Sequence, residues 1–161
     1  MEICFSRLND KLQKASEDGD VVIFGGAAMC LVFGSREYTR DVDALFKPKS
    51  DIYRMAKEVA EELSIQEDWL NDGIKGFINT QPPTTLILNY SNLKVYSANA
   101  DYILAMKCYA ARSDSKDKED AVFLANYLGL TNYNQVLDVT EKYIPSKLLS
   151  VKTVAFAQGL F

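Results

Sequence analysis

The 161-residue sequence contains no histidine and only three cysteines, and both scarcities limit the chemistry that is open to it. Without histidine there is no Ser-His-Asp triad, no Cys-His dyad and no histidine-ligated zinc site. Cys4, Cys30 and Cys108 are too few and too scattered for a four-cysteine metal site or a disulfide framework. Acid–base chemistry therefore falls to carboxylates, lysine, tyrosine or a bound metal ion.

Long apolar segments are also missing from the sequence. No run approaches the roughly 20 apolar residues of a membrane helix, and the N-terminus lacks the apolar core of a signal peptide. With so few cysteines, these features predict a reduced, cytoplasmic protein without a membrane partner. The 18 basic and 22 acidic side chains give a net charge of −4, which argues against broad binding to duplex nucleic acid. A local basic pocket for a nucleotide or an RNA end stays compatible with this charge.

Hydrophobic periodicity predicts an α/β arrangement followed by helices. Helices are expected over 2–17, 27–33, 51–67, 99–112, 115–128, 132–143 and 145–157, and strands over 21–24, 41–46, 84–90 and 93–97. Pro145 suits the start of the last helix. Since no linker rich in Pro, Gly or Ser interrupts the chain, one domain is expected over 1–161. It comprises an α/β core over 1–98, classed as α/β or α+β with a small mixed sheet, and a helical part over 99–161.

Two carboxylates, Asp41 and Asp43, stand two residues apart on a predicted strand. Residues i and i+2 of a strand point to the same face, so both carboxylates project together and Val42 points the other way. Adjacent carboxylates resist ionising together unless a cation lies between them, and Mg²⁺ takes such oxygen ligands along with substrate phosphates. The alternative interpretation is a solvated strand end, since an isolated Asp-x-Asp is common.

Gly25-Gly26 lies upstream, between a predicted strand and a short predicted helix. At such a turn the backbone N–H groups and the helix dipole favour phosphate, and glycine permits close approach. A tight turn without a ligand is the alternative. Arg36 and Arg40 flank the carboxylate strand, and they either contact phosphate or are solvated. Together these elements place a phosphate cradle and a metal site in one small unit.

Lys107 stands in the middle of an apolar stripe on the predicted helix 99–112. Its nearest neighbours on the helix surface are Ile103, Leu104, Ala110 and Ala111. A buried ammonium needs a partner or a cavity, and the next helix offers Asp117 and Asp120, with Arg112 between the helices. Two interpretations are open: an ion pair between helices, or a lysine directed at nucleotide phosphates and held by these carboxylates.

Residues 21–46, VVIFGGAAMCLVFGSREYTRDVDALF, resemble the nucleotidyltransferase superfamily, whose signature is a Gly-Gly or Gly-Ser turn, a short helix and a strand with two acids. The chain looks most like small bacterial nucleotidyltransferase-like proteins, some of which are toxins of toxin–antitoxin and abortive-infection systems. The resemblance covers most of residues 20–130 and includes REYTRD (36–41), WLND (69–72), KGF (75–77) and LAMKCYAARSDSKDKEDAVFL (104–124).

The resemblance implies a Mg²⁺-dependent nucleotidyltransferase that uses a nucleoside triphosphate (NTP). It implies metal-binding, catalytic roles for Asp41 and Asp43 and triphosphate binding at Gly25 and Gly26. It also favours a phosphate-binding Lys107, supported by the residues Arg112, Asp117 and Asp120. The acceptor would be a protein, an RNA end or a small molecule, and an antitoxin or another protein would be a partner. The apolar last helix also permits a homodimer.

One feature departs from the family pattern. Active members often carry a third carboxylate on a later strand, but the strands 84–90 and 93–97 hold no acid, and Asn89 stands in the first of them. Asp72 is a candidate substitute from its loop. A catalytically degenerate nucleotidyltransferase-fold protein, with a binding or regulatory role, is therefore the main alternative. A Mg²⁺-dependent phosphatase that uses Asp-x-Asp as nucleophile and acid ranks last, because REYTR, not an apolar strand, precedes the pair.

Overall fold

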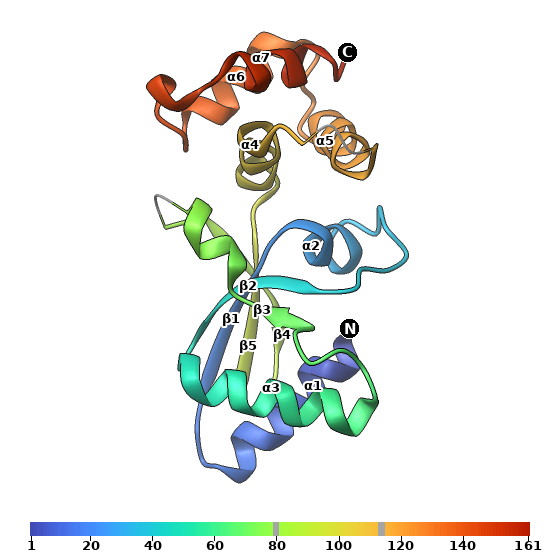
Figure 1. Ribbon diagram of the computed structural model, residues 1–161, viewed down its shortest axis with the longest axis vertical. Coiled ribbons are helices and arrows are strands. Elements are labelled where there is room, and N and C mark those ends of the chain that lie inside the picture. The colour runs from blue at the N-terminus through green and yellow to red at the C-terminus, as the bar shows by residue number, and fades with distance from the viewer. Residues whose placement is uncertain (79–80, 113–114) are drawn as a thin grey trace. The chain divides into compact units, whose positions relative to one another are not determined.

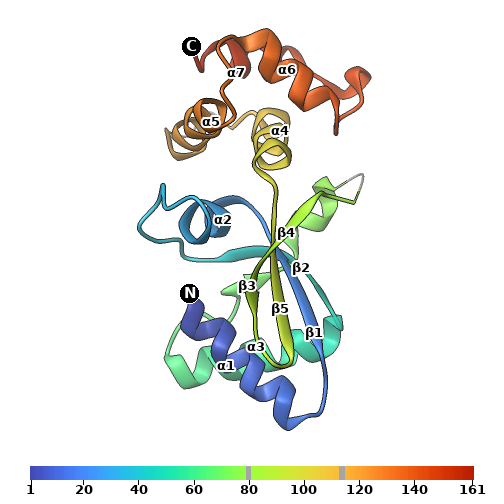
Figure 2. The ribbon, with the colours of Figure 1, turned by 180° about the vertical axis from the view of Figure 1, so that it is seen from behind.

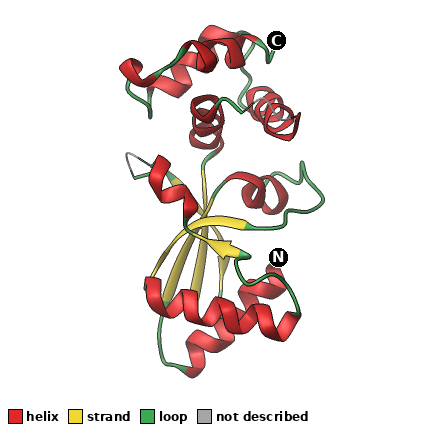
Figure 3. Cartoon of the chain, viewed as in Figure 1, coloured by secondary structure: helices red, strands yellow, loops and turns green. Residues whose placement is uncertain are grey.

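A computed structural model describes residues 1–78, 81–112 and 115–161 (Figures 1 and 3). The fold is mixed α/β with a five-stranded sheet, as expected. The chain divides into two compact units: unit 1 comprises Met1–Gly76 and Thr84–Ala98, and unit 2 comprises Phe77–Pro83 and Asn99–Phe161.

Unit 1 contains the whole sheet. Its elements are α1 (Glu2–Lys14), β1 (Gly19–Ile23), α2 (Gly25–Leu31), β2 (Val42–Lys47), α3 (Lys49–Leu63), β3 (Leu70–Asn71), β4 (Thr84–Asn89) and β5 (Leu93–Ala98), and the 3₁₀ helix η1 (Gly73–Phe77) begins after β3. The strand order is β3-β2-β1-β5-β4, with β1 parallel to β5 and antiparallel to β2. The two-residue strand β3 was not predicted, because so short a segment has no periodicity.

The helices α1 and α3 cover one face of this sheet, and they lie together in both views of unit 1 (Figures 1 and 2). A Cβ added at Gly19 would lie 3.0 Å from Leu12 of α1 and 3.1 Å from Ile52 of α3. Two residues further along β1, Val21 is fully buried on this same face. Because side chains alternate along a strand, Val22 points to the opposite face, where it is only half-buried.

The opposite side of the sheet is called the open face here. It is defined by the side chains in register with Asp20 and Val22, which are half-buried or exposed: Asp20, Val22, Asp43, Leu45, Lys47, Leu86, Lys94 and Tyr96. The helix-covered face instead carries residues such as Val21, Ala44 and Val95, all fully buried. The sheet thus has one face in the core and another with accessible side chains.

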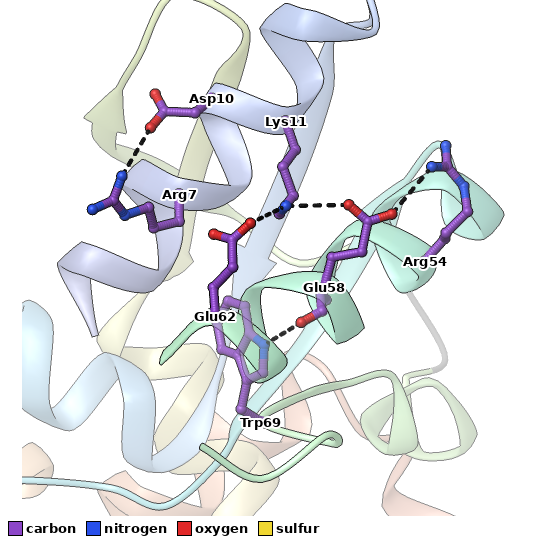
Figure 4. A network of polar contacts seen from close by, with 8 residues as sticks. Arg7, Asp10, Lys11, Arg54, Glu58, Glu62 and Trp69 are labelled. Atoms are coloured by element: carbon purple, nitrogen blue, oxygen red, sulfur yellow. Dashed lines mark hydrogen bonds and ion pairs between the residues drawn. The ribbon is translucent and has the colours of Figure 1, made fainter. Parts of the chain in front are cut away.

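A polar network holds α1 against α3 (Figure 4). The ammonium of Lys11 lies 3.2 Å from Glu58 and 2.5 Å from Glu62, and the side chain of this lysine is only 15% exposed. Nearby, the indole Nε1 of Trp69 donates a hydrogen bond of 2.9 Å to the carbonyl of Ala56. These contacts hold the C-terminal half of α3 and anchor the segment that leads into β3.

Unit 2 is helical: α4 (Ala100–Ala110), α5 (Ser115–Tyr127), α6 (Tyr133–Glu141), the 3₁₀ helix η2 (Ser146–Leu148) and α7 (Val151–Gln158). Helix α4 packs against α5, α6 and α7. The prediction of one last helix over 145–157 is wrong, because α7 begins only after Ser150. Ser150 and Thr153 form a capping box, and this capping box, not Pro145, sets the start of α7. Within the described ranges, no helix has the length and apolarity needed to cross a membrane.

Shortening a side chain on the helix-covered face is expected to lower the free energy of unfolding more than shortening one on the open face. Val21→Ala is expected to lower the free energy of unfolding by about 2 kcal/mol, because it removes buried methyl groups and leaves a cavity. Val22→Ala is expected to cost less than half as much, since its side chain is partly hydrated already. Urea unfolding of both variants tests this, and equal losses would contradict the assignment of faces.

Candidate functional site

Gly25 and Gly26, expected in a turn ahead of a helix over 27–33, are the first two residues of α2, and this pair, called the glycine turn below, lies beside Asp43. The backbone N–H of Phe24 donates to the carbonyl of Asp43 at 3.0 Å, which joins the end of β1 to β2. Gly25 has φ +49°, in the left-handed region that glycine occupies at little cost. A Cβ added at Gly25 would lie 3.8 Å from Oδ2 of Asp43. The structure therefore brings the glycine turn and the second carboxylate of the pair together within unit 1.

Gly26 is closely packed by two side chains. A Cβ at this position would lie 2.9 Å from Oγ1 of Thr39 and 3.2 Å from Nη1 of Arg36, so a larger residue would force these side chains to shift. Thr39 also donates from Oγ1 to the carbonyl of Asp41 at 3.2 Å. The segment from Arg36 to Asp43 thus packs on the glycine turn. The sequence analysis missed Thr39 as a site residue, although the REYTRD motif contains it.

The carboxylate pair spans the start of β2. The observed strand begins at Val42, one residue later than predicted, so Asp41 precedes it and is exposed. Val42 is 3% exposed, and its N–H donates to the carbonyl of Trp69 at 2.6 Å. Because Val42 points into the core, alternation along β2 directs Asp43 to the open face. Asp41 precedes the strand, so the common direction of the two carboxylates stays a prediction.

The two candidate arginines differ in position. The guanidinium of Arg36 lies against Gly26, as described above. Arg40 is exposed, and its carbonyl accepts a hydrogen bond of 3.0 Å from Nε2 of Gln66. Arg36 is therefore the arginine that the structure places at the glycine turn, whereas the backbone of Arg40 helps to hold the segment before β2.

Among the described residues of the open face, no third carboxylate lies in register with Asp43. In the pairing of β2 with β3, Asp43 stands opposite Asn71, an amide that the sequence analysis did not single out. Across the sheet, the register brings Thr84 of β4 to the level of Asp43, while Asn89 pairs with Lys94 at the far end. Within the described residues, no group of three or more acidic or cysteine side chains has the geometry to hold a metal.

Asp72, the candidate substitute, is engaged on the other side of the sheet. It follows Asn71, so it points to the helix-covered face, where its Oδ1 accepts from the hydroxyl of Tyr53 in α3 at 2.5 Å. Its Oδ2 lies 2.7 Å from the ammonium of Lys49 and 3.0 Å from that of Lys75. Lys49, followed by Tyr53 and Lys75, holds the pKa of Asp72 well below its usual range. Asp72 therefore stabilises the fold and does not join Asp43.

This depressed pKa makes the effect of Asp72 on stability depend on pH. Asp72→Asn is expected to cost about 1–2 kcal/mol at pH 7, because the carboxylate accepts charge-assisted hydrogen bonds. A lowered pKa contributes stability above the unfolded-state value of about 3.9, and this contribution is lost as the pH falls below it. The difference in the free energy of unfolding between the variant and the wild type, measured by urea unfolding, should therefore become smaller below pH 4. The exposed Asp68→Asn is the control, and a gap independent of pH would contradict the prediction.

In unit 2, Lys107 forms the centre of a buried ion cluster. Its ammonium lies 2.7 Å from Oδ1 of Asp117 and 2.7 Å from Oδ2 of Asp120, both on α5. The Lys107 side chain is 8% exposed and that of Asp120 is 4% exposed. Arg112 follows the end of α4 and is exposed. Two carboxylates thus compensate the charge of Lys107, which is the ion pair between helices that the sequence analysis left open.

Removal of Lys107 deprives Asp117 and Asp120 of the ammonium that both of them contact. Lys107→Met is expected to destabilise unit 2 by about 3 kcal/mol, the typical cost of breaking a buried pair from one side. Adding Asp117→Asn and Asp120→Asn should restore part of this loss, because the remaining groups are then neutral. Thermal unfolding measures both effects. A single variant as stable as wild type would contradict the burial of this cluster.

The cysteines take no part in this candidate site. All three are free, and burial raises the pKa of the Cys108 thiol to about 12. At neutral pH this thiol is protonated, so it is neither a nucleophile nor a metal ligand. Cys30 is only half-buried.

Comparisons of the chain with protein-family models, with curated proteins and with solved structures find no match. The resemblance to nucleotidyltransferases is therefore a prediction from the sequence. The geometry adds one physical fact to it, namely that the glycine turn, Arg36 and Asp43 are neighbours in unit 1.

Proposed function

We propose that this protein is a Mg²⁺-dependent nucleotidyltransferase that binds an NTP at the Gly25-Gly26 turn and transfers its nucleotidyl group to an acceptor. The observation that carries the proposal is the distance of 3.8 Å between a Cβ position at Gly25 and the carboxylate of Asp43. At such a site the backbone can approach a phosphate closely, and a carboxylate lies beside it. This arrangement suits phosphoryl-type transfer, which depends on positioning and charge neutralisation and needs no histidine.

The donor set at this site fits Mg²⁺. Asp41 and Asp43 offer the hard oxygen ligands that this cation combines with substrate phosphates and water. When bound, Mg²⁺ supplies charge neutralisation on the triphosphate. The glycine turn admits the phosphates at close range, and Arg36 lies where its guanidinium adds positive charge to them. Lys107 is left outside the proposal, because Asp117 and Asp120 already compensate its charge.

The alternative function is a nucleotidyltransferase-fold protein that binds nucleotide without transferring it. It is favoured by one observation: among the described residues, Asn71 and Thr84 stand beside and across from Asp43, and no third carboxylate joins the pair. A cytoplasmic location and an antitoxin-like protein partner belong to either version of the proposal.

The first test is nucleotide binding. Wild-type protein is expected to bind at least one of the four NTPs in calorimetric titration, and only with Mg²⁺ present. Asp41→Asn with Asp43→Asn should abolish this binding, because the variant loses both ligands of the cation. Asp72→Asn is the matched control, since it removes a carboxylate from the other face of the sheet and should leave binding intact. Binding that depends neither on Mg²⁺ nor on the pair would contradict the proposal.

The second part of the test separates the enzyme from the binding protein. Incubation with α-labelled NTPs and cell extract should yield a labelled acceptor with wild type and none with the Asp41→Asn, Asp43→Asn variant. Mg²⁺-dependent binding without any labelled product would instead support the non-transferring alternative.

A further inference from the structure

The two acids of the candidate metal site are held in different ways. Asp43 lies within β2, where its carbonyl accepts a hydrogen bond of 3.0 Å from the N–H of Phe24 and its backbone pairs with Asn71 of β3. Asp41 precedes the strand and is exposed, so the pairing of β2 with its neighbours does not include it. Mg²⁺ demands near-ideal octahedral geometry, so two carboxylates bind it together only when both keep their positions. In such a site, a contact outside the sheet has to hold Asp41.

The peptide group between Asp41 and Val42 is held at both of its polar ends. Its C=O accepts a hydrogen bond of 3.2 Å from Oγ1 of Thr39, and its N–H donates one of 2.6 Å to the carbonyl of Trp69. Because a peptide group is planar and its C=O and N–H point in opposite directions, these two contacts together fix its orientation. That orientation sets the backbone torsion angle ψ of Asp41, on which the direction of its side chain depends.

Thr39 is itself held by the glycine turn. The side chain is half-buried, and a Cβ added at Gly26 would lie 2.9 Å from its Oγ1 and 3.5 Å from its Cβ. A β-branched side chain has few χ1 rotamers, so this packing presents the hydroxyl in a constant direction. On the next residue, the carbonyl of Arg40 accepts a hydrogen bond of 3.0 Å from Nε2 of Gln66, which follows α3. A continuous set of contacts thus runs from the glycine turn through Thr39 to the main chain of Asp41.

Two roles of the Thr39 hydroxyl have different consequences. A hydroxyl that only supports the loop before β2 contributes to folding and has no special effect on a bound cation. The hydrogen bond to Asp41 is exposed to solvent, so its loss changes the free energy of unfolding little. A displaced ligand, by contrast, lowers the affinity for the cation directly. Measurements of stability and of metal dependence therefore separate the two roles.

We propose that Thr39 is a positioning residue of the metal site. Its hydroxyl holds the carbonyl of Asp41 and so keeps the carboxylate of this residue where it binds the same Mg²⁺ as Asp43. Thr39 does not contact the cation and acts only through the main chain of Asp41. This inference rests on the proposed function, because it takes Asp41 and Asp43 to be the ligands of Mg²⁺.

Thr39→Val tests the hydroxyl, because this change removes the oxygen and keeps the branched shape of the side chain. The assay is calorimetric titration with each of the four NTPs at a series of Mg²⁺ concentrations. The Mg²⁺ concentration that gives half-maximal NTP binding is expected to rise about fivefold, the typical effect of one net hydrogen bond. At saturating Mg²⁺ the NTP affinity should return to the wild-type value, and the free energy of unfolding in urea should stay close to it. Thr39→Ser keeps the hydroxyl and should behave like wild type.

A second measurement needs neither nucleotide nor metal. The amide hydrogen of Val42 belongs to the peptide group that Thr39 holds, and its exchange with solvent reports local opening of this group. Exchange at Val42 is expected to be faster in Thr39→Val and unchanged in Thr39→Ser. Equal exchange in the wild type and in Thr39→Val would overturn the proposed hold on Asp41, whatever the result of the titrations.

The matched control is Thr131→Val in unit 2. Oγ1 of Thr131 also forms an exposed hydrogen bond of 3.2 Å, to Oε1 of Gln135, so the control loses the same kind of contact. It should leave the Mg²⁺ dependence and the exchange at Val42 unchanged, and an equal shift in this control would overturn the inference. An equal loss of NTP affinity at every Mg²⁺ concentration in Thr39→Val would also overturn it.

The titrations distinguish failure of this inference from failure of the proposed function. If the proposed function is wrong, the wild type itself shows no Mg²⁺-dependent NTP binding. If only the role of Thr39 is wrong, the wild type binds with Mg²⁺, and Thr39→Val has the same half-maximal Mg²⁺ concentration.

Discussion

The burial of one sheet face under α1 and α3 is the constraint on which the rest of unit 1 depends. Gly19 has no side chain, so Leu12 of α1 and Ile52 of α3 approach the first residue of β1 closely. Side chains alternate along every strand, and each strand is in register with its neighbour. Once Val21 points into this core, the directions of the side chains on β1, β2 and β5 follow, whereas a register irregularity between Leu86 and Leu88 interrupts the alternation in β4.

That constraint decides which acids share a site. Asp43 and Asp72 lie close together around the β2–β3 pair, yet they point to opposite faces. Asp72 therefore meets Tyr53 of α3 and two lysines, while Asp43 meets the Gly25-Gly26 turn. The same alternation places Lys47 and Tyr96 on the side of Asp43. Structural and candidate functional charges are thus separated by the thickness of the sheet.

Unit 2 uses charge in another way. Lys107, Asp117 and Asp120 join α4 to α5 through contacts of 2.7 Å inside an apolar bundle. Such a cluster costs desolvation, and its main effect is to penalise any packing of the helices that leaves one member alone. Helix packing therefore explains Lys107, Asp117 and Asp120, and the candidate nucleotide site draws on unit 1.

Local patterns in the sequence determined most helices and strands, the glycine turn, the carboxylate pair and the carboxylates available to Lys107, because periodicity and short spacings set these features. The start of α7 was misjudged, since Pro145 is a weaker signal than the Ser150 capping box. Only the tertiary structure decided that β3 exists, that Thr39 closes on Gly26, and that Asp72 turns away from Asp43. It also decided which sheet face stays accessible. Alternation along a strand states which side chains point the same way, but the packing of distant helices determines which of the two faces is covered.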